Sequence, residues 1–363
     1  MKKLFALLLS TMMLLSLCVT VFANDEEKFE LLPIKNDDYY SAVYAQIVSC
    51  EEEIHSKQRE VEISDGMYLY SLGEQPIAVF YSLSPQGYAI LDYKNGVVLE
   101  YSTEQNHPFY RNTKDRYYYD GVFNYYIKVS EGKFQNLATQ KVVSAKSAYV
   151  ITSESFYADN NVPNISAKST SEGPVYLTGS TRLYNCNVTS NFQYFYPNFS
   201  SSQINSVPGV CGSVACAIVV AYMDDYKSSL AGSGDFATDW KKTGGTIADN
   251  TYGKYLVKEF VGYVEPSGNG SFLLNPGMSS YLKAHNISGG CTLGLISVYI
   301  QTKNSIKSDG SGNPIIIGLS DHYCVGTGYK NISGKQVRVN TGWGTYSWIA
   351  ADTIVSTWTL FLN

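Results

Sequence analysis

Apolar and polar positions alternate in short runs through the N-terminal part of the chain. Segments such as MYLYSL, IAVFYSL, GYAILDY and GVVLEYS are separated by the turn-forming strings GEQP, SPQG and KNG. Short apolar runs rich in Tyr, Val and Ile, bounded by Gly and Pro, predict β-strands. A helix-like stretch, YYSAVYAQIVSCEEEIHSKQ, precedes them. We therefore expect a β-rich N-terminal domain.

The C-terminal part changes from helical to strand-like patterning. After Pro208 and Gly209, apolar residues recur at helical spacing from Val214 to Tyr222, which predicts a helix beginning at Cys211. Three further segments predict helices, ADNTYGKYLVKEFVGY, NPGMSSYLKAHN and SVYIQTKNSIKSDGSG. The segments PIIIGL, YCVGTGY, QVRVN, YSWIA and TWTLFLN then predict strands. Helices followed by an antiparallel sheet indicate an α+β architecture.

Two stretches follow neither pattern. Residues 1–23 have a basic start, an apolar run and a VFA end, which predicts a secretory signal cleaved after Ala23. From about 157 to 179, Ser, Thr, Asn, Pro and Gly dominate, which predicts a flexible linker and processing region. The expected organisation is therefore a signal peptide, a β-rich domain over 24–156 that is a candidate propeptide, the linker, and a second domain over 180–363.

Composition narrows the function classes. The chain has a net charge of −5 and no basic cluster, so nucleic-acid binding is not expected. Beyond the signal, no apolar run is long enough to span a bilayer, so we expect a secreted protein without stable membrane association. Residues 24–165 are acidic and 166–363 are slightly basic, which favours the N-terminal domain as an intramolecular partner of the second domain.

Cysteine usage favours a thiol enzyme over a disulfide framework. Seven Cys occur, of which Cys18 leaves with the signal and Cys50 lies in the N-terminal part. The remaining five cannot all pair with one another. No CxxC pair is present, so a zinc site is unsupported and we expect no metal or other cofactor.

Cys211 is the candidate nucleophile. A thiol in the first turn of a helix meets unsatisfied N–H groups and the helix dipole, which, with a cationic His beside it, can bring a Cys pKa from about 8.5 to roughly 3.5–7.5. The alternative, a buried small apolar residue, suits Cys216 better, because Cys216 lies further into the helix.

The partners of this thiol are expected downstream. His322 begins a predicted strand after a Ser-Asp turn and is the candidate general base, whereas His285 is interpreted as a cation at a helix C-terminus. Asn340 ends the strand QVRVN, where its amide can accept a hydrogen bond from His322, although an Asn at a strand end also commonly begins a turn. Trp343 is then expected to cover that hydrogen bond, unless it is simply a core aromatic residue.

An acyl transfer also needs donors for the developing oxyanion. The backbone N–H of Cys211 can be one donor. The side chain of Gln203 is the candidate for the other, because it is the nearest upstream amide of suitable length.

These strings resemble a known family. CGSVACA, NPIIIGLSDHYCVGTGY and VNTGWG are similar to the Cys, His and Asn boxes of papain-fold cysteine peptidases, in the bacterial branch of streptopain-like and bacteriocin-processing (double-glycine leader) peptidase-like proteins. The resemblance covers roughly residues 180 to 363. It implies that Cys211 is the nucleophile, His322 the base, Asn340 the orienting residue and Gln203 an oxyanion donor. CGS replaces the CGP of the bacteriocin-processing type, and the spacing from Gln to Cys is longer than in papain.

The resemblance extends to the N-terminal part. GEQPIAVFYSLSPQGYAILDYKNGVVLEYS looks like the pro-domain of the streptopain-like group. The expected fold is therefore a papain-like α+β domain, with Cys on the helical side and His and Asn on the antiparallel sheet, preceded by a β-rich domain. The expected protein is a secreted cysteine peptidase, made as a zymogen, that hydrolyses peptides or proteins through a thioester acyl-enzyme.

Two other functions remain open. A peptidoglycan-cleaving cysteine amidase of the NlpC/P60 or CHAP type also places Cys at a helix start and His on a sheet, but this chain lacks a DCSG-type box and wall-binding repeats. A non-catalytic adhesion or inhibitor protein on a decayed peptidase fold is the second alternative, and the intact Cys, His and Asn set argues against it.

Overall fold

A computed structural model gives the conformation of most of the two predicted domains. It describes residues 43–44, 47, 61–94, 96–104, 109, 116–145, 172–184, 194–198, 209–227, 250–264, 274–294, 297–332 and 334–362. The predicted signal peptide, the predicted linker as far as residue 171, and Gln203 lie outside the described residues. So do most residues of the predicted N-terminal helix.

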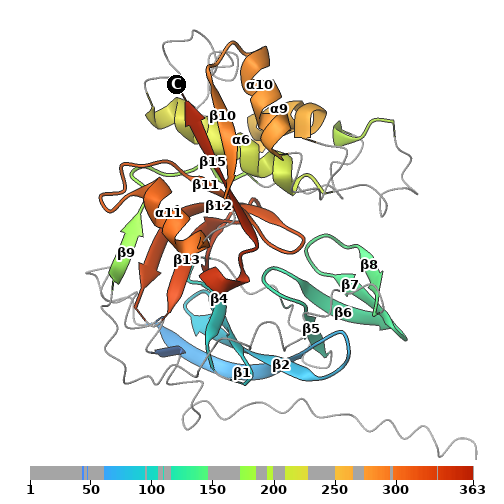
Figure 1. The fold of residues 1–363 in the computed structure, drawn as a ribbon. Helices are drawn as coiled ribbons and strands as arrows, with labels where there is room; N and C mark the ends of the chain where they lie inside the picture. Colours follow the sequence, from blue (N-terminus) through green and yellow to red (C-terminus); the bar gives the residue numbers. More distant parts are fainter. Residues whose placement is uncertain are drawn as a thin grey trace, which may run out of the picture.

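The N-terminal part is built from strands, as its short apolar runs predict (Figure 1). Its elements are β1 (Glu62–Tyr70), β2 (Pro76–Ser84), β3 (Tyr88–Asp92), β4 (Val98–Ser102), β5 (Tyr117–Tyr119), β6 (Tyr125–Ser130), β7 (Lys133–Asn136) and β8 (Val142–Ser144). Strands β1 to β4 form an antiparallel meander, and β5 to β8 form a second one joined to it by a parallel contact between β1 and β5.

The C-terminal part combines helices and strands, and the four predicted helices are confirmed. Its helices are α6 (Cys211–Tyr226), α9 (Asn250–Val264), α10 (Leu274–Ala284), α11 (Val298–Ile306) and the short 3-10 helix η3 (Ala351–Thr353). Its strands are β9 (Glu172–Tyr176), β10 (Gly289–Gly294), β11 (Ile315–Gly318), β12 (Tyr323–Asn331), β13 (Lys335–Asn340), β14 (Tyr346–Ala350) and β15 (Ser356–Leu362). The chain is thus a mixed α+β protein. None of the described helices has the length and apolar character needed to cross a membrane.

The described strands of both parts form one sheet (Figure 1). Its order is β10-β15-β11-β12-β13-β14-β4-β3-β2-β1-β5-β6-β7-β8, and β9 pairs with β12. The two parts meet where β14 pairs with β4, with Trp348 opposite Tyr101 and Ile349 opposite Glu100. The predicted flexible linker, 157–179, is not flexible at its end. Strand β9 lies within it and pairs with β12, and Val175 and Tyr176 pack against the core.

Helix α6 lies at the centre of the C-terminal part. Its residues Gly212 to Met223 are all buried, so the helix is enclosed on every side and not on one apolar face alone. It packs against β11, β12 and α9, and α9 in turn stacks Phe260 on Tyr281 of α10 with ring centroids 3.9 Å apart. This packing fixes the position of the first turn of α6, which carries Cys211.

Candidate active site

Cys211 is the first residue of α6 and is half-buried. The first turn contains no acidic residue, and the residue before the helix, Val210, provides no side-chain cap. No acidic side chain opposes an anion at this helix start, and the helix dipole favours negative charge there. The predicted placement of this thiol at a helix start is confirmed.

The first turn of α6 contacts the two segments that follow the predicted His and Asn. A Cβ placed on Gly212 would lie 3.5 Å from the Tyr323 ring, and one placed on Gly342 would lie 3.1 Å from a methyl carbon of Val214. Tyr323 directly follows His322 in the chain, and Gly342 follows Thr341. The helix start, the His322 turn and the turn after β13 thus converge in one place.

His322 ends the turn before β12 and is 6% exposed. Its Nε2 is 2.8 Å from the backbone oxygen of Thr341. Its ring stacks on Trp343 with centroids 4.1 Å apart and planes inclined by 21°. Trp343 therefore lies on the histidine ring, but the bond that it covers runs from His322 to the Thr341 carbonyl and not to Asn340.

The proton arrangement of His322 follows from its neighbours. A carbonyl oxygen can only accept, so Nε2 carries the hydrogen in this bond. Burial lowers the pKa of His322 to about 4, while the Thr341 carbonyl acts in the opposite direction. The ring is therefore neutral at pH 7 and Nδ1 holds a lone pair. Such a ring is a base whose orientation is already fixed by its second nitrogen.

Asn340 lies at the end of its strand, as predicted, but its side chain does not bond to His322. It is fully buried at the end of β13, and its Nδ2 donates to Thr181 Oγ1 at 3.0 Å and to the Arg182 oxygen at 2.8 Å. Its Oδ1 accepts from the Gly342 N–H at 3.1 Å. The expected bond from Asn340 to His322 is not formed in this structure, and the Thr341 carbonyl occupies that position. Asn340 instead shapes the turn that presents this carbonyl.

The turn after β13 needs glycine for its geometry. Gly342 has a φ of +78°, a left-handed conformation that favours glycine. The Asn340 side chain bonded to the N–H two residues later closes this turn, as Asn commonly does. The backbone of the turn therefore holds both the Thr341 oxygen and the Trp343 ring against His322.

His285 lies at the C-terminal end of a helix, as the sequence indicated. It directly follows α10, and its Nε2 lies 2.7 Å from Oε1 of Glu259 in α9. Its partner on another helix explains its position without reference to the site. Gln203 lies outside the described residues, so its predicted contribution stays a prediction.

The N-terminal part covers His322. Phe123, in the turn between β5 and β6, lies edge-on to the His322 ring and to the Trp343 ring, with centroids 5.8 Å away in both cases. It is 2% exposed and has a φ of +67°, which is uncommon for a bulky residue. The surrounding contacts must hold this backbone in place.

Glu100 of β4 supplies one of those contacts. Its Oε2 accepts from the Phe123 N–H at 3.0 Å, and its Oε1 accepts from the Tyr125 hydroxyl. Burial raises the pKa of Glu100 to about 8, against the lowering effects of these hydrogen bonds. Glu100 is therefore largely protonated at neutral pH and fixes the turn that presents Phe123.

A second contact joins the same turn to the residue before the histidine. Asn124 Nδ2 donates to Asp321 Oδ1 at 2.6 Å. Burial raises the pKa of Asp120 to about 6, and the neighbouring charge of Asp321 adds to that shift. The carboxyl groups of Asp120 and Asp321 are thus close enough to interact electrostatically.

The hairpin of β7 and β8 also approaches the site. Burial lowers the pKa of Lys141, and the Cys211 charge opposes that shift, so this lysine lies within electrostatic range of the thiol. Burial raises the pKa of Cys324 in β12, with a further contribution from Cys211. Segments of both parts therefore surround the helix start.

Sequence reasoning missed the covering residues. The string YYYDGVFNYYIKV is strand-like throughout, so the turn that divides it into β5 and β6 was not predicted, and nothing in it shows where that turn docks. Thr341 was also missed, because a backbone carbonyl leaves no residue-type signal. Within the described ranges, no group of three or more His, Cys, Asp or Glu residues is arranged to hold a metal ion.

Comparisons with known proteins give little further information. No family model matches the chain, and no curated protein matches it. Among solved structures, a mutant fragment of prointerpain A from Prevotella intermedia matches with a TM-score of 0.42 and 14% identity, covering 80% of this chain and 97% of that one. This likeness is too low to carry an argument about fold or function.

Proposed function

We propose that this chain is a secreted, papain-like cysteine peptidase made in a latent form, acting on peptides or proteins. In the proposed reaction, Nδ1 of His322 removes the thiol proton of Cys211, and the sulfur attacks the peptide carbonyl. The C–N bond breaks, the His322 proton passes to the leaving amine, and a thioester acyl-enzyme remains. Water activated by the same ring then hydrolyses the thioester.

The observation that carries this proposal is the state of His322. Its Nε2–H is committed to the Thr341 carbonyl, and its ring is held between Trp343 and Phe123. The remaining lone pair belongs to a residue whose neighbour, Tyr323, contacts the first turn of the Cys211 helix. We propose that this lone pair faces the Cys211 thiol, which would give the arrangement that nucleophilic catalysis requires.

The oxyanion is stabilised in this proposal at the start of α6. The backbone N–H of Cys211 is proposed as one donor, because the first N–H groups of a helix point outward along its axis, where an anion binds. Gln203 is proposed as the second donor. Asn340 is proposed as a positioning residue that does not touch the substrate. Its side chain shapes the turn that carries the Thr341 carbonyl.

Latency follows from the covering residues. Phe123 lies against both His322 and Trp343, where a substrate would need to approach the ring. The N-terminal part must therefore move or be cut away before a peptide reaches Cys211. The predicted linker before residue 172 is the proposed place for such a cut.

The test compares Cys211→Ser with the matched change Cys216→Ser in the same full-length protein. After self-processing or treatment with a second protease, the wild type and Cys216→Ser should hydrolyse a fluorogenic protein substrate. Both should also form a mass-detectable adduct with a peptidyl vinyl sulfone, whereas Cys211→Ser should do neither. Full hydrolysis by Cys211→Ser would refute the assignment. Release of peptidoglycan fragments without any peptide hydrolysis would favour the amidase alternative.

A further inference from the structure

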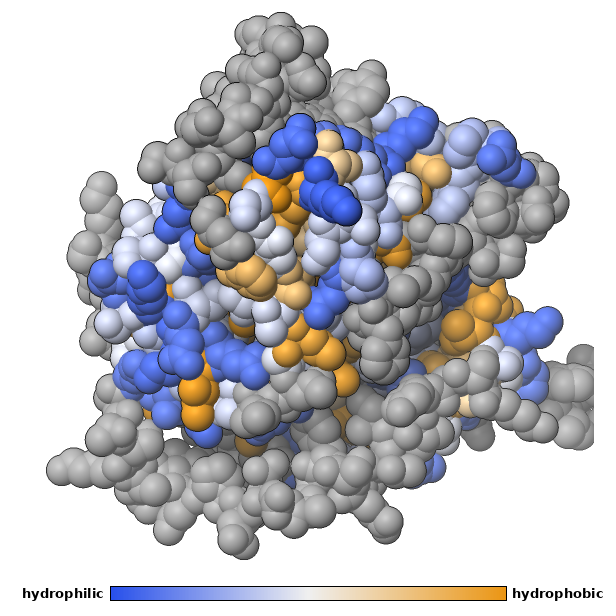
Figure 2. Space-filling view, turned by 45° about the horizontal axis from the view of Figure 1, so that its top comes forward, coloured by the Kyte–Doolittle hydropathy of each residue, from blue (hydrophilic) through white to orange (hydrophobic). Residues whose placement is uncertain are grey.

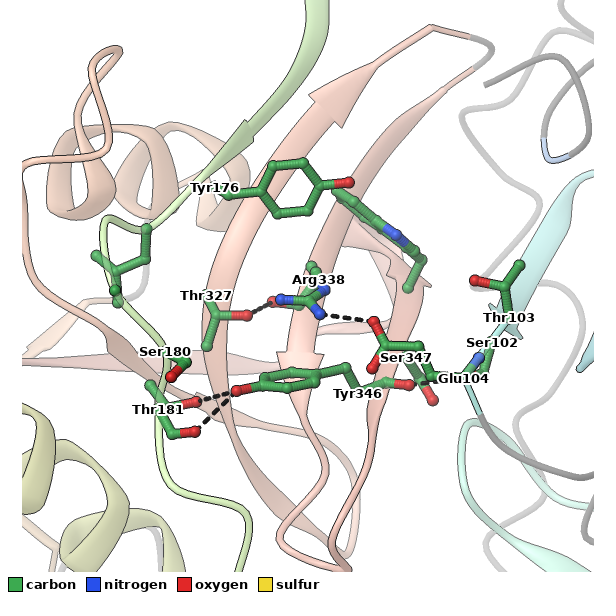
Figure 3. A pocket seen from close by; sticks show the side chains of 13 residues that line it. Ser102, Thr103, Glu104, Tyr176, Ser180, Thr181, Thr327, Arg338, Tyr346 and Ser347 are labelled. Carbon is green, nitrogen blue, oxygen red and sulfur yellow. Dashed lines mark hydrogen bonds and ion pairs between the residues drawn. The ribbon is translucent and has the colours of Figure 1, made fainter. Parts of the chain in front are cut away.

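A cavity of about 280 Å³ lies at the junction of the two parts, and its lining includes neither Cys211 nor His322. We propose that this cavity binds a small carboxylate with a flat apolar body, and that Arg338 is its charged partner. The lining comes from the end of β4, from β9 and the residues after it, and from β12, β13 and β14 (Figure 3). The volume is at the small end of ligand sites and suits a molecule of amino-acid size.

Arg338 of β13 is the central group of this cavity. Its guanidinium carbon lies 3.8 Å from the centroid of the Tyr346 ring and 5.4 Å from that of Tyr176 (Figure 3). Stacking on tyrosine faces holds the plane of the guanidinium while leaving its edge able to donate. The two rings thus orient Arg338 before any ligand arrives.

Most donor capacity of Arg338 is unused. A guanidinium has five N–H donors. The structure gives Arg338 one side-chain hydrogen bond, from Nη2 to Oε1 of Glu104 at 2.7 Å. The remaining donors have no acceptor among the described residues. A carboxylate is the ligand that pairs with such a planar fork through two parallel hydrogen bonds.

The hydroxyl groups of the lining are largely committed to the protein. Ser102 Oγ donates to the backbone oxygen of Tyr346 at 2.8 Å, and Thr327 Oγ1 donates to the backbone oxygen of Arg338 at 3.3 Å. Thr181 Oγ1 lies 2.9 Å from the Tyr346 hydroxyl. Recognition by these groups is therefore limited, and Arg338 is left as the group that selects the ligand.

The walls select a flat apolar body. Tyr176 lies edge-on to Trp348, with centroids 5.9 Å apart, and both rings line the cavity with Tyr346. Aromatic walls beside a cation favour a ligand with a carboxylate at one end and an aromatic or similar flat group at the other.

Glu104 is the competitor for Arg338. Its side chain is 47% exposed, against 19% for Arg338, and its Oε1 accepts the hydrogen bond that Nη2 of Arg338 donates. Ion pairs with so exposed a member contribute little to stability. A ligand carboxylate that pairs with Arg338 therefore displaces Glu104 at small cost. Because Glu104 follows β4, that exchange also removes one link between the two parts.

The test measures binding of 3-phenylpropionate to the full-length chain carrying Cys211→Ala, by isothermal titration calorimetry. The neutral isostere 3-phenylpropanamide is the matched ligand control. The carboxylate should bind at least tenfold more tightly than the amide, and Glu104→Gln should tighten carboxylate binding several-fold by removing the competitor. Arg338→Met should weaken it at least tenfold, with Arg338→Lys between the two.

Two results would overturn the proposal. One is equal binding of the acid and the amide, including no binding of either. The other is a Glu104→Gln protein that binds the acid no better than the parent. Glu104 is exposed, so this second readout remains available if Arg338→Met fails to fold. Neither result depends on peptidase activity, so failure here leaves the proposed function untouched.

Discussion

At the residue scale, the proposed chemistry depends on which nitrogen of His322 carries its hydrogen. The Thr341 carbonyl decides this, because it bonds to Nε2 and accepts a hydrogen there. The Cys, His and Asn boxes were visible as residue types in the sequence. The carbonyl was not, because any residue after Asn340 would supply the same backbone group. The sequence therefore supplied the candidate residues but not the bond that orients the histidine.

Asn340→Ala separates these two ways of orienting His322. The change orphans the Gly342 N–H and the Arg182 carbonyl, so the free energy of unfolding should fall by about 1–3 kcal/mol. The bond from His322 to the Thr341 carbonyl remains, so kcat of the processed enzyme should fall only roughly tenfold to a hundredfold, against several orders of magnitude for His322→Ala. Denaturant unfolding and peptide hydrolysis measure the two effects. An Asn340→Ala enzyme as inactive as His322→Ala would mean that the amide itself orients the ring.

At the element scale, β4 and the turn from Asp120 to Asn124 form the cover over the site. The short strand-like runs allowed the sequence to predict β4, whereas the turn from Asp120 to Asn124 was not predicted, because its string is strand-like throughout. Their docking could not be predicted, because it depends on pairing between β4 and β14, which lie far apart in the sequence. The positive φ of Phe123 also leaves no sequence signal, since Phe is a poor residue for that conformation.

Glu100→Gln tests how the cover responds to pH. The pKa of Glu100 is about 8 in the folded protein against 4.5 for an ordinary Glu. Between these values the folded state binds the extra proton, so the free energy of unfolding falls as pH rises, by up to about 1.4 kcal/mol per pH unit. Gln cannot ionise, so Glu100→Gln should flatten this decline and be the more stable protein at pH 8.

Asp120→Asn is the matched comparison for that experiment. The pKa of Asp120 is raised from 3.8 to about 6, so ionisation of Asp120 lowers the free energy of unfolding between these pH values. Asp120→Asn should therefore flatten the decline only in that pH range. Chemical unfolding at several pH values measures both variants. An unchanged slope between pH 6 and 8 in Glu100→Gln would contradict the assigned role of Glu100.

At the scale of the whole molecule, the surface mixes hydrophilic and hydrophobic residues. Figure 2 shows hydrophilic and hydrophobic residues interspersed on the described surface, without one dominant apolar area in that view. Some of the contacts that join the two parts are instead internal. Lys330 of β12 is 1% exposed, and its Nζ lies 2.5 Å from the Tyr101 hydroxyl and 4.5 Å from the Trp348 ring centroid. The charge contrast in the sequence indicated docking, but this buried cation and its aromatic neighbours could not be predicted from it.

Trp348→Ala tests whether this junction holds the parts together. Trp348 is 4% exposed and stacks on Tyr101, so its loss should destabilise the protein by about 3–5 kcal/mol. Trp358→Ala is the matched control, because Trp358 is equally buried but packs on Tyr323 within the C-terminal part. Hydrogen exchange should accelerate in β4 for Trp348→Ala and not for Trp358→Ala. Equal acceleration in both would show that the junction has no separate stability.

The most direct test of the central claim is the rate at which a peptidyl vinyl sulfone modifies Cys211 in the uncut chain. Phe123→Ala removes the ring that lies on His322, whereas Phe134→Ala removes an equally buried ring that packs on Tyr118. Peptide mapping by mass spectrometry locates the adduct. A latent cysteine peptidase predicts slow modification in the wild type and in Phe134→Ala, and modification at Cys211 at least roughly tenfold faster in Phe123→Ala. Equal rates in all three proteins, or no adduct on Cys211 in Phe123→Ala, would contradict the account.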